Sequence, residues 1–281
     1  MGGMARIGLL HPGQMGFAVG RTLKNSGHEV IWASEGRSGR TGRRSVDGGF
    51  ADVHTLEAVA QSAAMIVSVC PPEFASDLAE SVARAGFRGL YTDANAVSPD
   101  SKLRIAQCVE TSGGSFVDGG IIGLPPQERG RTWLYLSGPR ASEAASYFTA
   151  GPMEVEVLGE QVGKASALKM CYAGWNKGST ALAAAIVAAA SEMSVLEELK
   201  CAWARGGPVY DDLERQLLRA APKAWRWAGE MREIAATLEA AGLPGGFHQA
   251  SEQLYERLRT LKDSGDVQMK DVLARLVKEP V

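Results

Sequence analysis

The stretch "ARIGLLHPGQMGFAVGRTLKNSGHEVIWASEGRS", residues 5–38, decides the predicted fold. A short apolar run of β type, residues 5–10, leads through a Gly/Pro turn into an apolar-periodic segment that stops at Gly27. A second β-type run, residues 28–33, follows directly. This order predicts a strand, a helix and a second strand parallel to the first, as in the opening unit of an α/β sheet.

The turn "HPGQMG" is a variant of a dinucleotide-binding fingerprint. That fingerprint needs one residue for a tight turn, one that lets a pyrophosphate come close, and one that packs the helix on the strand. These positions are His11, Gly13 and Gly16, so only the first has lost its glycine. The alternative is an ordinary strand-to-helix turn. The predicted cofactor contacts of this turn are His11, Pro12, Gly13, Gln14, Met15 and Gly16.

The end of the second predicted strand bears on the choice of dinucleotide. NAD-preferring sites hold the ribose 2′-hydroxyl with a carboxylate about 20 residues beyond the glycine turn. Here Ser34, Glu35, Arg37 and Ser38 occupy that region. Hydroxyl and guanidinium groups suit a 2′-phosphate, so these residues favour NADP, while Glu35 keeps NAD open. The alternative for the arginine is a solvated loop.

Further apolar runs, residues 64–69, 89–94 and 114–120, repeat the pattern with helical stretches between them. Alternation of this kind predicts a parallel sheet covered by helices on both faces, with ligands bound beyond the carboxyl ends of the strands. We therefore predict a Rossmann-type, doubly wound dinucleotide-binding domain over residues 1–160.

The second half changes period after residue 160. The alanine-rich segment beginning at residue 164 predicts a helix of about 30 residues, because Ala, Leu, Met and Lys have high helix propensity. Residues 209–242 and 246–277 are typical of amphipathic helices. Residues 161–281 are accordingly predicted to form an all-helical substrate and dimerisation domain.

Composition excludes several classes of protein. The net charge is -2 with only one local basic cluster, which argues against nucleic-acid binding. Four dispersed cysteines give neither a disulfide framework nor a zinc site, and no metal is expected. No signal-peptide pattern opens the chain, and the longest apolar run, residues 181–190, is too short to span a bilayer. These features predict a cytoplasmic protein with a small-molecule substrate.

Six motifs, in order, extend the argument: "IGLLHPGQMG", "SVCPP", "DANAVSP", "DGGIIG", "GEQVGKASALKM" and "EMREIAATLEAAGLP". Together they resemble motifs of the β-hydroxyacid dehydrogenase and 6-phosphogluconate dehydrogenase superfamily. Residues 223–258 resemble a domain of unknown function that follows 6-phosphogluconate dehydrogenase-like N-terminal domains. The resemblance covers nearly the whole chain, and it implies a nicotinamide cofactor, a catalytic lysine at Lys169 and a homodimer.

The resemblance also implies roles for other residues. Cofactor contacts carried over from it are Val69, Cys70, Pro71, Asn95 and Arg232, and the substrate loop is Gly119, Gly120, Ile122 and Gly123. Several positions depart from the family pattern, and at one of them Asn95 stands where the family has a serine. Ile122 replaces a serine that holds substrate, Ala173 replaces an asparagine, and Arg232 replaces a lysine. The departures argue against a plain 3-hydroxyacid substrate.

At 100° per residue, Lys169 and Asn176 share one helical stripe, with Tyr172 at its edge. With Asn95, these residues form the predicted catalytic set, and a positioned lysine can give and take the proton that accompanies hydride transfer. The predicted activity is NAD(P)-dependent hydride transfer at a C–O bond of a small polar metabolite. The alternatives are imine reduction, oxidative decarboxylation as in 6-phosphogluconate dehydrogenase, and a non-catalytic NADP-binding sensor.

Overall fold

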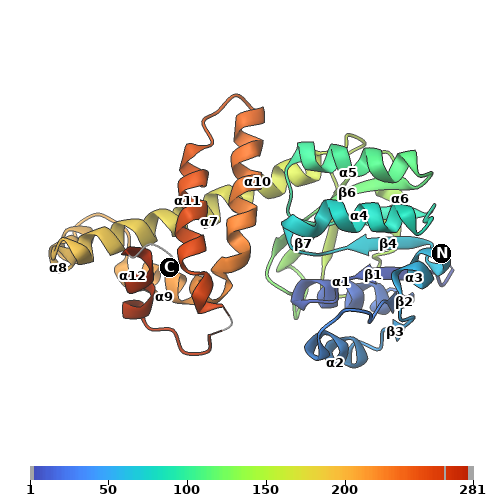
Figure 1. Cartoon of the computed structure of the whole chain (residues 1–281), viewed down its shortest axis with the longest axis horizontal. Coiled ribbons are helices and arrows are strands. Elements are labelled where there is room, and N and C mark those ends of the chain that lie inside the picture. Colours follow the sequence, from blue (N-terminus) through green and yellow to red (C-terminus); the bar gives the residue numbers. More distant parts are fainter. Residues whose placement is uncertain (1–2, 263, 278–281) are drawn as a thin grey trace. The chain divides into compact units, whose positions relative to one another are not determined.

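The structure is a computed structural model that describes residues 3–262 and 264–277. The chain divides into two compact units, residues 1–170 and 171–281 (Figure 1). The division falls inside one long helix, α7 (Lys164–Glu192), whose first turns pack in the first unit. The boundary predicted near residue 160 lies just before this helix.

An eight-stranded sheet forms the centre of the first unit, in the order β3-β2-β1-β4-β5-β6-β7-β8. The strands are β1 (Arg6–Leu10), β2 (Glu29–Trp32), β3 (Ala51–Asp52), β4 (Met65–Ser68), β5 (Leu90–Asp93), β6 (Ser115–Gly123), β7 (Thr132–Ser137) and β8 (Glu154–Val157). All neighbours are parallel except β6 and β7. The predicted Rossmann-type parallel sheet is confirmed, with one antiparallel pair, β6 and β7, that the sequence did not indicate. A short return loop joins β6 to β7, and such a loop can connect only antiparallel strands.

Helices cover both faces of this sheet (Figure 1). They are α1 (Gln14–Asn25), α2 (Gly39–Asp47), α3 (Leu56–Ser62), the 3₁₀ turn η1 (Pro72–Phe74), α4 (Ala75–Arg84), α5 (Pro99–Thr111) and α6 (Ala141–Ser146). Strand residues alternate between two cores. Ile7 and Leu9 pack with α1 and α6, whereas Leu10 and Ile66 pack with α3, α4 and α5. The carboxyl ends of the strands are thus held between two apolar layers.

The second unit is entirely helical in its described residues, as predicted. After α7 come α8 (Leu196–Trp203), α9 (Tyr210–Ala220), η2 (Ala221–Arg226), α10 (Trp227–Ala240), α11 (Gly246–Arg257), η3 (Arg259–Leu261) and α12 (Met269–Val277). The 29-residue α7 confirms the predicted long helix. The segment 209–242 is not one helix, because Pro222 near the start of η2 interrupts it. Among the described residues, no helix has both the length and the hydropathy needed to cross a membrane.

Candidate functional site

The glycine turn connects β1 to α1 with the geometry that the sequence predicts. His11 takes a left-handed backbone, with φ of +68°, and its carbonyl accepts the N–H of Gly13 at 2.6 Å. A Cβ at Gly16 would collide with that same carbonyl oxygen, so this position requires glycine for helix-to-strand packing. His11, which replaces the first glycine of the fingerprint, therefore adopts the left-handed backbone that the turn requires.

Gly13, unlike Gly16, has open space around it. A Cβ at Gly13 would lie no closer than 3.9 Å to any atom beyond its chain neighbours, so the protein does not fill this space. Helix α1 begins directly afterwards, and no described side chain caps its first N–H groups. An open approach to uncapped N–H groups is the arrangement that binds phosphate at a helix start. The turn fits a pyrophosphate.

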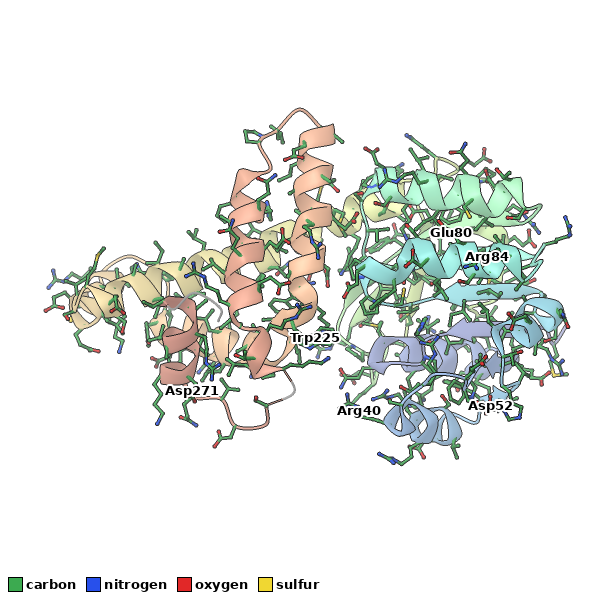
Figure 2. All side chains as sticks on the ribbon, in the orientation of Figure 1. Arg40, Asp52, Glu80, Arg84, Trp225 and Asp271 are labelled. Atoms are coloured by element: carbon green, nitrogen blue, oxygen red, sulfur yellow. The ribbon has the colours of Figure 1, made fainter. Side chains whose placement is uncertain are left out.

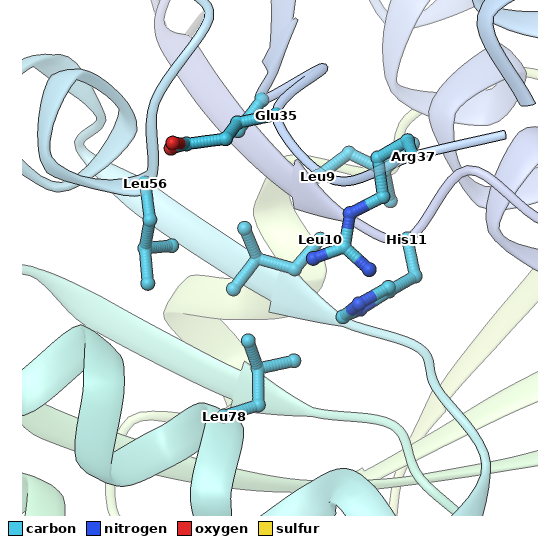
Figure 3. A pocket seen from close by; sticks show the side chains of 8 residues that line it. Leu9, Leu10, His11, Glu35, Arg37, Leu56 and Leu78 are labelled. Atoms are coloured by element: carbon cyan, nitrogen blue, oxygen red, sulfur yellow. The ribbon is translucent and has the colours of Figure 1, made fainter.

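A cavity of about 110 Å³ lies beside the turn (Figure 3). Its lining comes from β1, the loop after β2, α3 and α4, and consists of Leu9, Leu10, His11, Ala33, Glu35, Arg37, Leu56 and Leu78. Figure 3 shows the Arg37 guanidinium reaching past Leu10 toward the His11 imidazole, while the Glu35 carboxylate points toward Leu56. An apolar floor with a few polar groups at its rim is typical of a small-molecule site.

Burial shifts the titration of two groups that line this cavity. Burial lowers the pKa of His11 to about 4, and the nearby charge of Arg37 contributes in the same direction. Burial likewise lowers the pKa of Arg37. The His11 Nδ1 atom is buried with no hydrogen-bond partner among the described residues. Two nitrogen-bearing groups therefore face one cavity, each less solvated than in water.

The neighbouring serines have structural partners. Ser38 caps α2, because its Oγ accepts the N–H of Thr41 at 3.3 Å. Ser34 donates to Asp52, a carboxylate at the end of β3 that the sequence did not single out. Burial alone would raise the pKa of Asp52, but hydrogen bonds from His54 and Ser34 lower it overall. Both serine hydroxyls therefore have hydrogen-bond partners within the protein.

Asn95 lies just beyond β5 and ties the strand ends together. Its amide donates to Ser68 Oγ and to Asp93 Oδ2, each at 3.0 Å, and its Oδ1 accepts the N–H of Cys70 at 2.6 Å. The side chain is only 2% exposed. Cys70 is also enclosed, and burial raises the pKa of its thiol to about 12. Asn95 thus fixes the backbone of the predicted "SVCPP" contact, Val69 to Pro71.

Below these strand ends lies a cluster of charges with no exposed surface. The Lys102 Nζ atom, from α5, lies 2.5 Å from Asp93 Oδ1 and 3.6 Å from Asp118 Oδ1. It also donates to the carbonyls of Asp93 and Gly119, at 2.6 and 3.2 Å. Asp93 and Asp118 are paired across β5 and β6, so Lys102 separates two adjacent like charges.

Asp118 also anchors the start of α7. Its Oδ2 atom accepts the N–H groups of Gly163 and Ser166, each at 3.0 Å, and the hydroxyls of Ser166 and Ser137. A carboxylate at this position satisfies otherwise unpaired N–H groups and complements the helix dipole. The buried charges therefore fix the helix that carries Lys169.

Lys169 lies within the first unit, over the part of β6 that continues beyond Asp118. A Cβ at Gly120 would lie 2.6 Å from the Ala165 carbonyl and 3.0 Å from the Lys169 Cβ, so α7 crosses β6 in direct contact. Lys169 itself is half-buried. The close crossing requires glycine at 120 and sets the lysine near the carboxyl edge of the sheet.

The other predicted substrate-loop residues lie on β6. A Cβ at Gly119 would lie 3.1 Å from the Asp93 carbonyl oxygen and 3.3 Å from the Ala94 Cα atom, which is closer than ordinary van der Waals contact, and Ile122 is buried. Gly123 has a φ of +124° and lies against Arg131 on the β6–β7 return. Packing therefore explains why glycine occupies positions 119 and 123. The substrate contacts of the β6 residues stay predictions.

Three predicted residues lie in the second unit. Tyr172 is 48% exposed, and Asn176 donates to the Tyr172 carbonyl at 2.9 Å. Arg232, on α10, pairs with Glu252 of α11 at 3.0 Å. Trp225, labelled in Figure 2, lies under the Lys262 ammonium at 4.0 Å. Catalytic and cofactor roles for the first three stay predictions.

Sequence reasoning missed the buried charges and one arginine. Asp93 ends β5 and Asp118 lies opposite it within β6, and these two carboxylates, each following an apolar run, were a signal that a buried cation separates them. Lys102 carried no signal of its own within α5. Arg44 donates to the Pro12 carbonyl at 3.3 Å, which ties α2 to the glycine turn.

A predominantly parallel sheet with an open glycine turn at its first crossover is the architecture of dinucleotide-binding domains. Residues 190–258 match the family described as Domain of unknown function (DUF1932). A 28.5 kDa protein of the 7S RNA 5′ region of Methanothermus fervidus is 26% identical over 194 residues, which are 69% of this chain and 74% of that protein. These matches concern proteins whose names give no activity.

Solved structures extend the comparison. Conserved protein MTH1747, described as structurally similar to 3-hydroxyacid dehydrogenases, is 25% identical, with a TM-score of 0.64 over 91% of this chain and 97% of that one. A 3-hydroxyisobutyrate dehydrogenase from Salmonella typhimurium is 14% identical, with a TM-score of 0.70 over 96% and 99%. A reductive aminase from Aspergillus terreus, in complex with NADPH, is 16% identical, with a TM-score of 0.56 over 98% and 99%. The chain has the fold of the 6-phosphogluconate dehydrogenase-like NAD(P)-binding superfamily.

Proposed function

We propose that this protein is an NADP-preferring oxidoreductase that transfers a hydride between nicotinamide and a C–O bond of a small polar metabolite. The observation that carries the proposal is the pairing of an open glycine turn with a half-buried lysine on the helix that crosses β6. Gly13 leaves room for the pyrophosphate, and the uncapped start of α1 supplies N–H donors for it.

Arg37 supports the preference for NADP. Its guanidinium lines the cavity and, among the described residues, forms no ion pair with a carboxylate. An Arg in this region can bind a 2′-phosphate through two parallel hydrogen bonds. Glu35 lines the same cavity, and its carboxylate is the group that would favour a free 2′-hydroxyl and therefore NAD.

Lys169 is the proposed general acid and base. Bound NADPH would supply the hydride, and negative charge would then develop on the substrate oxygen. The lysine ammonium neutralises that charge by donating a proton, and in the reverse direction the amine accepts it. Asp118 and Lys102 act through the position of α7 and are positioning residues in this scheme.

Imine reduction is the second candidate. The fold shared with a reductive aminase supports it, since the same hydride transfer would serve a C–N bond. The retained lysine favours the C–O reaction, because a carbonyl oxygen needs a proton donor as it is reduced. Oxidative decarboxylation has less support, because no basic cluster for a sugar phosphate accompanies Lys169 in the sequence.

A second copy of the chain is the proposed partner. Tyr172, Trp175, Leu182 and Ile186 are between 43% and 77% exposed and recur along α7 at spacings of three, four and seven residues. That recurrence gives one apolar stripe on the helix, and an exposed stripe of this kind marks a protein interface. A helix-to-helix homodimer through this stripe is consistent with the family resemblance.

Two measurements test the proposed function. NADPH and NADH titrations of wild type, Arg37→Ala and Arg43→Ala should show NADPH binding weakened tenfold or more by R37A alone, with NADH little affected. Arg43 is the matched control because it is an exposed arginine of α2. Turnover should then appear with one class in a panel of aldehydes, 2- and 3-oxo acids and cyclic imines. Binding of NADPH without turnover on the whole panel would instead support a sensor.

A further inference from the structure

His11 and Arg37 form a pair that has no acidic hydrogen-bond or ion-pair partner among the described residues. Both line one cavity, and the His11 Nδ1 atom has no hydrogen-bond partner among the described residues. Burial lowers the pKa of the imidazole, and the Arg37 cation beside it adds to that effect because it opposes a second positive charge. An anion bound between the two groups would give the imidazole a hydrogen-bond partner and would offset the charge of Arg37 that opposes protonation of His11.

The charged and titratable groups around His11 come from several elements. The loop after β2 contributes Arg37 and Glu35, and α2 contributes Arg44, whose guanidinium donates to the Pro12 carbonyl. Cys70 follows β4, and its thiol stays neutral because burial raises its pKa to about 12. Glu35 is the acid lining the cavity, and Figure 3 shows its carboxylate directed toward Leu56 and away from the imidazole.

The backbone at His11 makes the position informative. A φ of +68° is unfavourable for most residues that have a Cβ, and Asn, Asp and His tolerate it better than others. In the dinucleotide fingerprint this position is a glycine. Glycine would satisfy the geometry of this turn, but the chain carries a histidine with its imidazole there.

We propose that His11 and Arg37 together bind the 2′-phosphate of NADP, and that His11 takes up a proton when this phosphate binds. The inference rests on the proposed function, since it assumes that the cavity receives the phosphorylated ribose. It adds a second phosphate ligand and makes NADP binding dependent on pH.

The direction of the effect follows from proton linkage. In the free protein His11 is neutral at pH 7, because burial and Arg37 lower its pKa to about 4. A bound dianion raises that pKa, so binding and protonation assist each other. If the pKa returns to its ordinary value of about 6.5, affinity through His11 rises about tenfold between pH 8 and pH 5.5.

Isothermal titration calorimetry with adenosine 2′,5′-bisphosphate tests the proposal, and 5′-AMP is the matched ligand without a 2′-phosphate. His11→Asn is the matched variant, because Asn tolerates the left-handed backbone but carries no proton at these pH values. The phosphate itself has a second pKa near 6, which affects both proteins alike. The readout is therefore the wild-type to H11N affinity ratio, together with proton uptake measured in two buffers of different ionisation enthalpy.

The wild-type to H11N affinity ratio for the bisphosphate should rise about tenfold from pH 8 to pH 5.5. The same ratio for 5′-AMP should not change with pH. Wild type alone should also show proton uptake on binding, a result that does not depend on the variant's folding. A constant ratio with no proton uptake would overturn the role of His11 while leaving NADP binding intact. An equal rise with 5′-AMP would overturn the assignment to the 2′-phosphate. Failure of wild type to bind the bisphosphate at any pH would instead remove the NADP preference itself.

Discussion

The Lys102 Nζ atom lies 2.5 Å from Asp93 Oδ1, and both side chains are fully buried beneath the carboxyl ends of the strands. The ammonium also separates Asp93 from Asp118, which caps the first turn of α7. One lysine of α5 thus holds two strand ends and, through Asp118, the helix that bears Lys169. The proposed site depends on a charge cluster that contacts no solvent.

Lys102→Met should destabilise the protein by about 3–5 kcal/mol, because it leaves two buried carboxylates without their counter-ion. Urea unfolding followed by circular dichroism measures the change. Lys200→Met is the matched control, since Lys200 forms an exposed pair with Glu197 and should cost below about 1 kcal/mol. Equal losses in the two variants would show that the buried cluster is not a principal support of the fold.

Gly13→Ala should separate cofactor binding from stability. The added Cβ meets no atom within 3.9 Å, and the φ of -67° suits alanine, so the free energy of unfolding should not fall. NADPH affinity should drop tenfold or more, because the methyl group occupies the approach to the α1 N–H groups.

The control for this variant is Gly42→Ala in α2, where an added Cβ also meets nothing within 4 Å. It should leave NADPH affinity unchanged and raise stability by about 0.5–1 kcal/mol, as expected for alanine in a helix. Unaltered NADPH binding in G13A would mean that the pyrophosphate does not approach this turn.

The stability of the fold should depend on His11 at acid pH. The pKa of His11 is about 4 in the folded protein, against about 6.5 in an unfolded chain, so the unfolded state binds more protons between these values. Stability is therefore lost as pH falls from 6.5 toward 4, by about 3 kcal/mol relative to His11→Asn. Unfolding of both proteins in urea at pH 7.5 and pH 4 gives this difference. Parallel losses in the two proteins would contradict the burial of a neutral imidazole.

The stripe on α7 should control the oligomeric state. Trp175 is 77% exposed, and Trp175→Glu places a charge on the proposed dimer contact, which should yield monomers. Leu243→Glu is the control, because Leu243 is 55% exposed but lies beyond the end of α10. Light scattering after size-exclusion chromatography reports the mass. A dimer that survives W175E would place the interface elsewhere.

The sequence predicted the parts of the fold that depend on local pattern. Apolar runs ending at turn residues indicated β1, β2, β4, β5 and β6, and the glycines indicated the turn after β1. The two-residue β3 is too short to form a pattern. Strand β7 was missed because its direction depends on the length of its return loop and on pairing with the extended end of β6.

The sequence predicted those parts of the site that belong to a local sequence motif. Gly13 and Gly16 belong to one turn, and Lys169 follows from a motif resemblance. The contacts of Lys102 with Asp93 and Asp118 join residues far apart in sequence, so no local pattern revealed them. The same holds for the Arg44 contact with Pro12.

Replacement of Lys169 by alanine tests the central claim most directly, once a substrate has been found in the panel. Lys169→Ala should keep NADPH affinity within about threefold and reduce kcat by a hundredfold or more, as for the loss of a general acid. Lys164→Ala, an exposed lysine at the start of the same helix, should leave kcat and NADPH affinity unchanged. An unchanged kcat in K169A would contradict the proposed proton transfer.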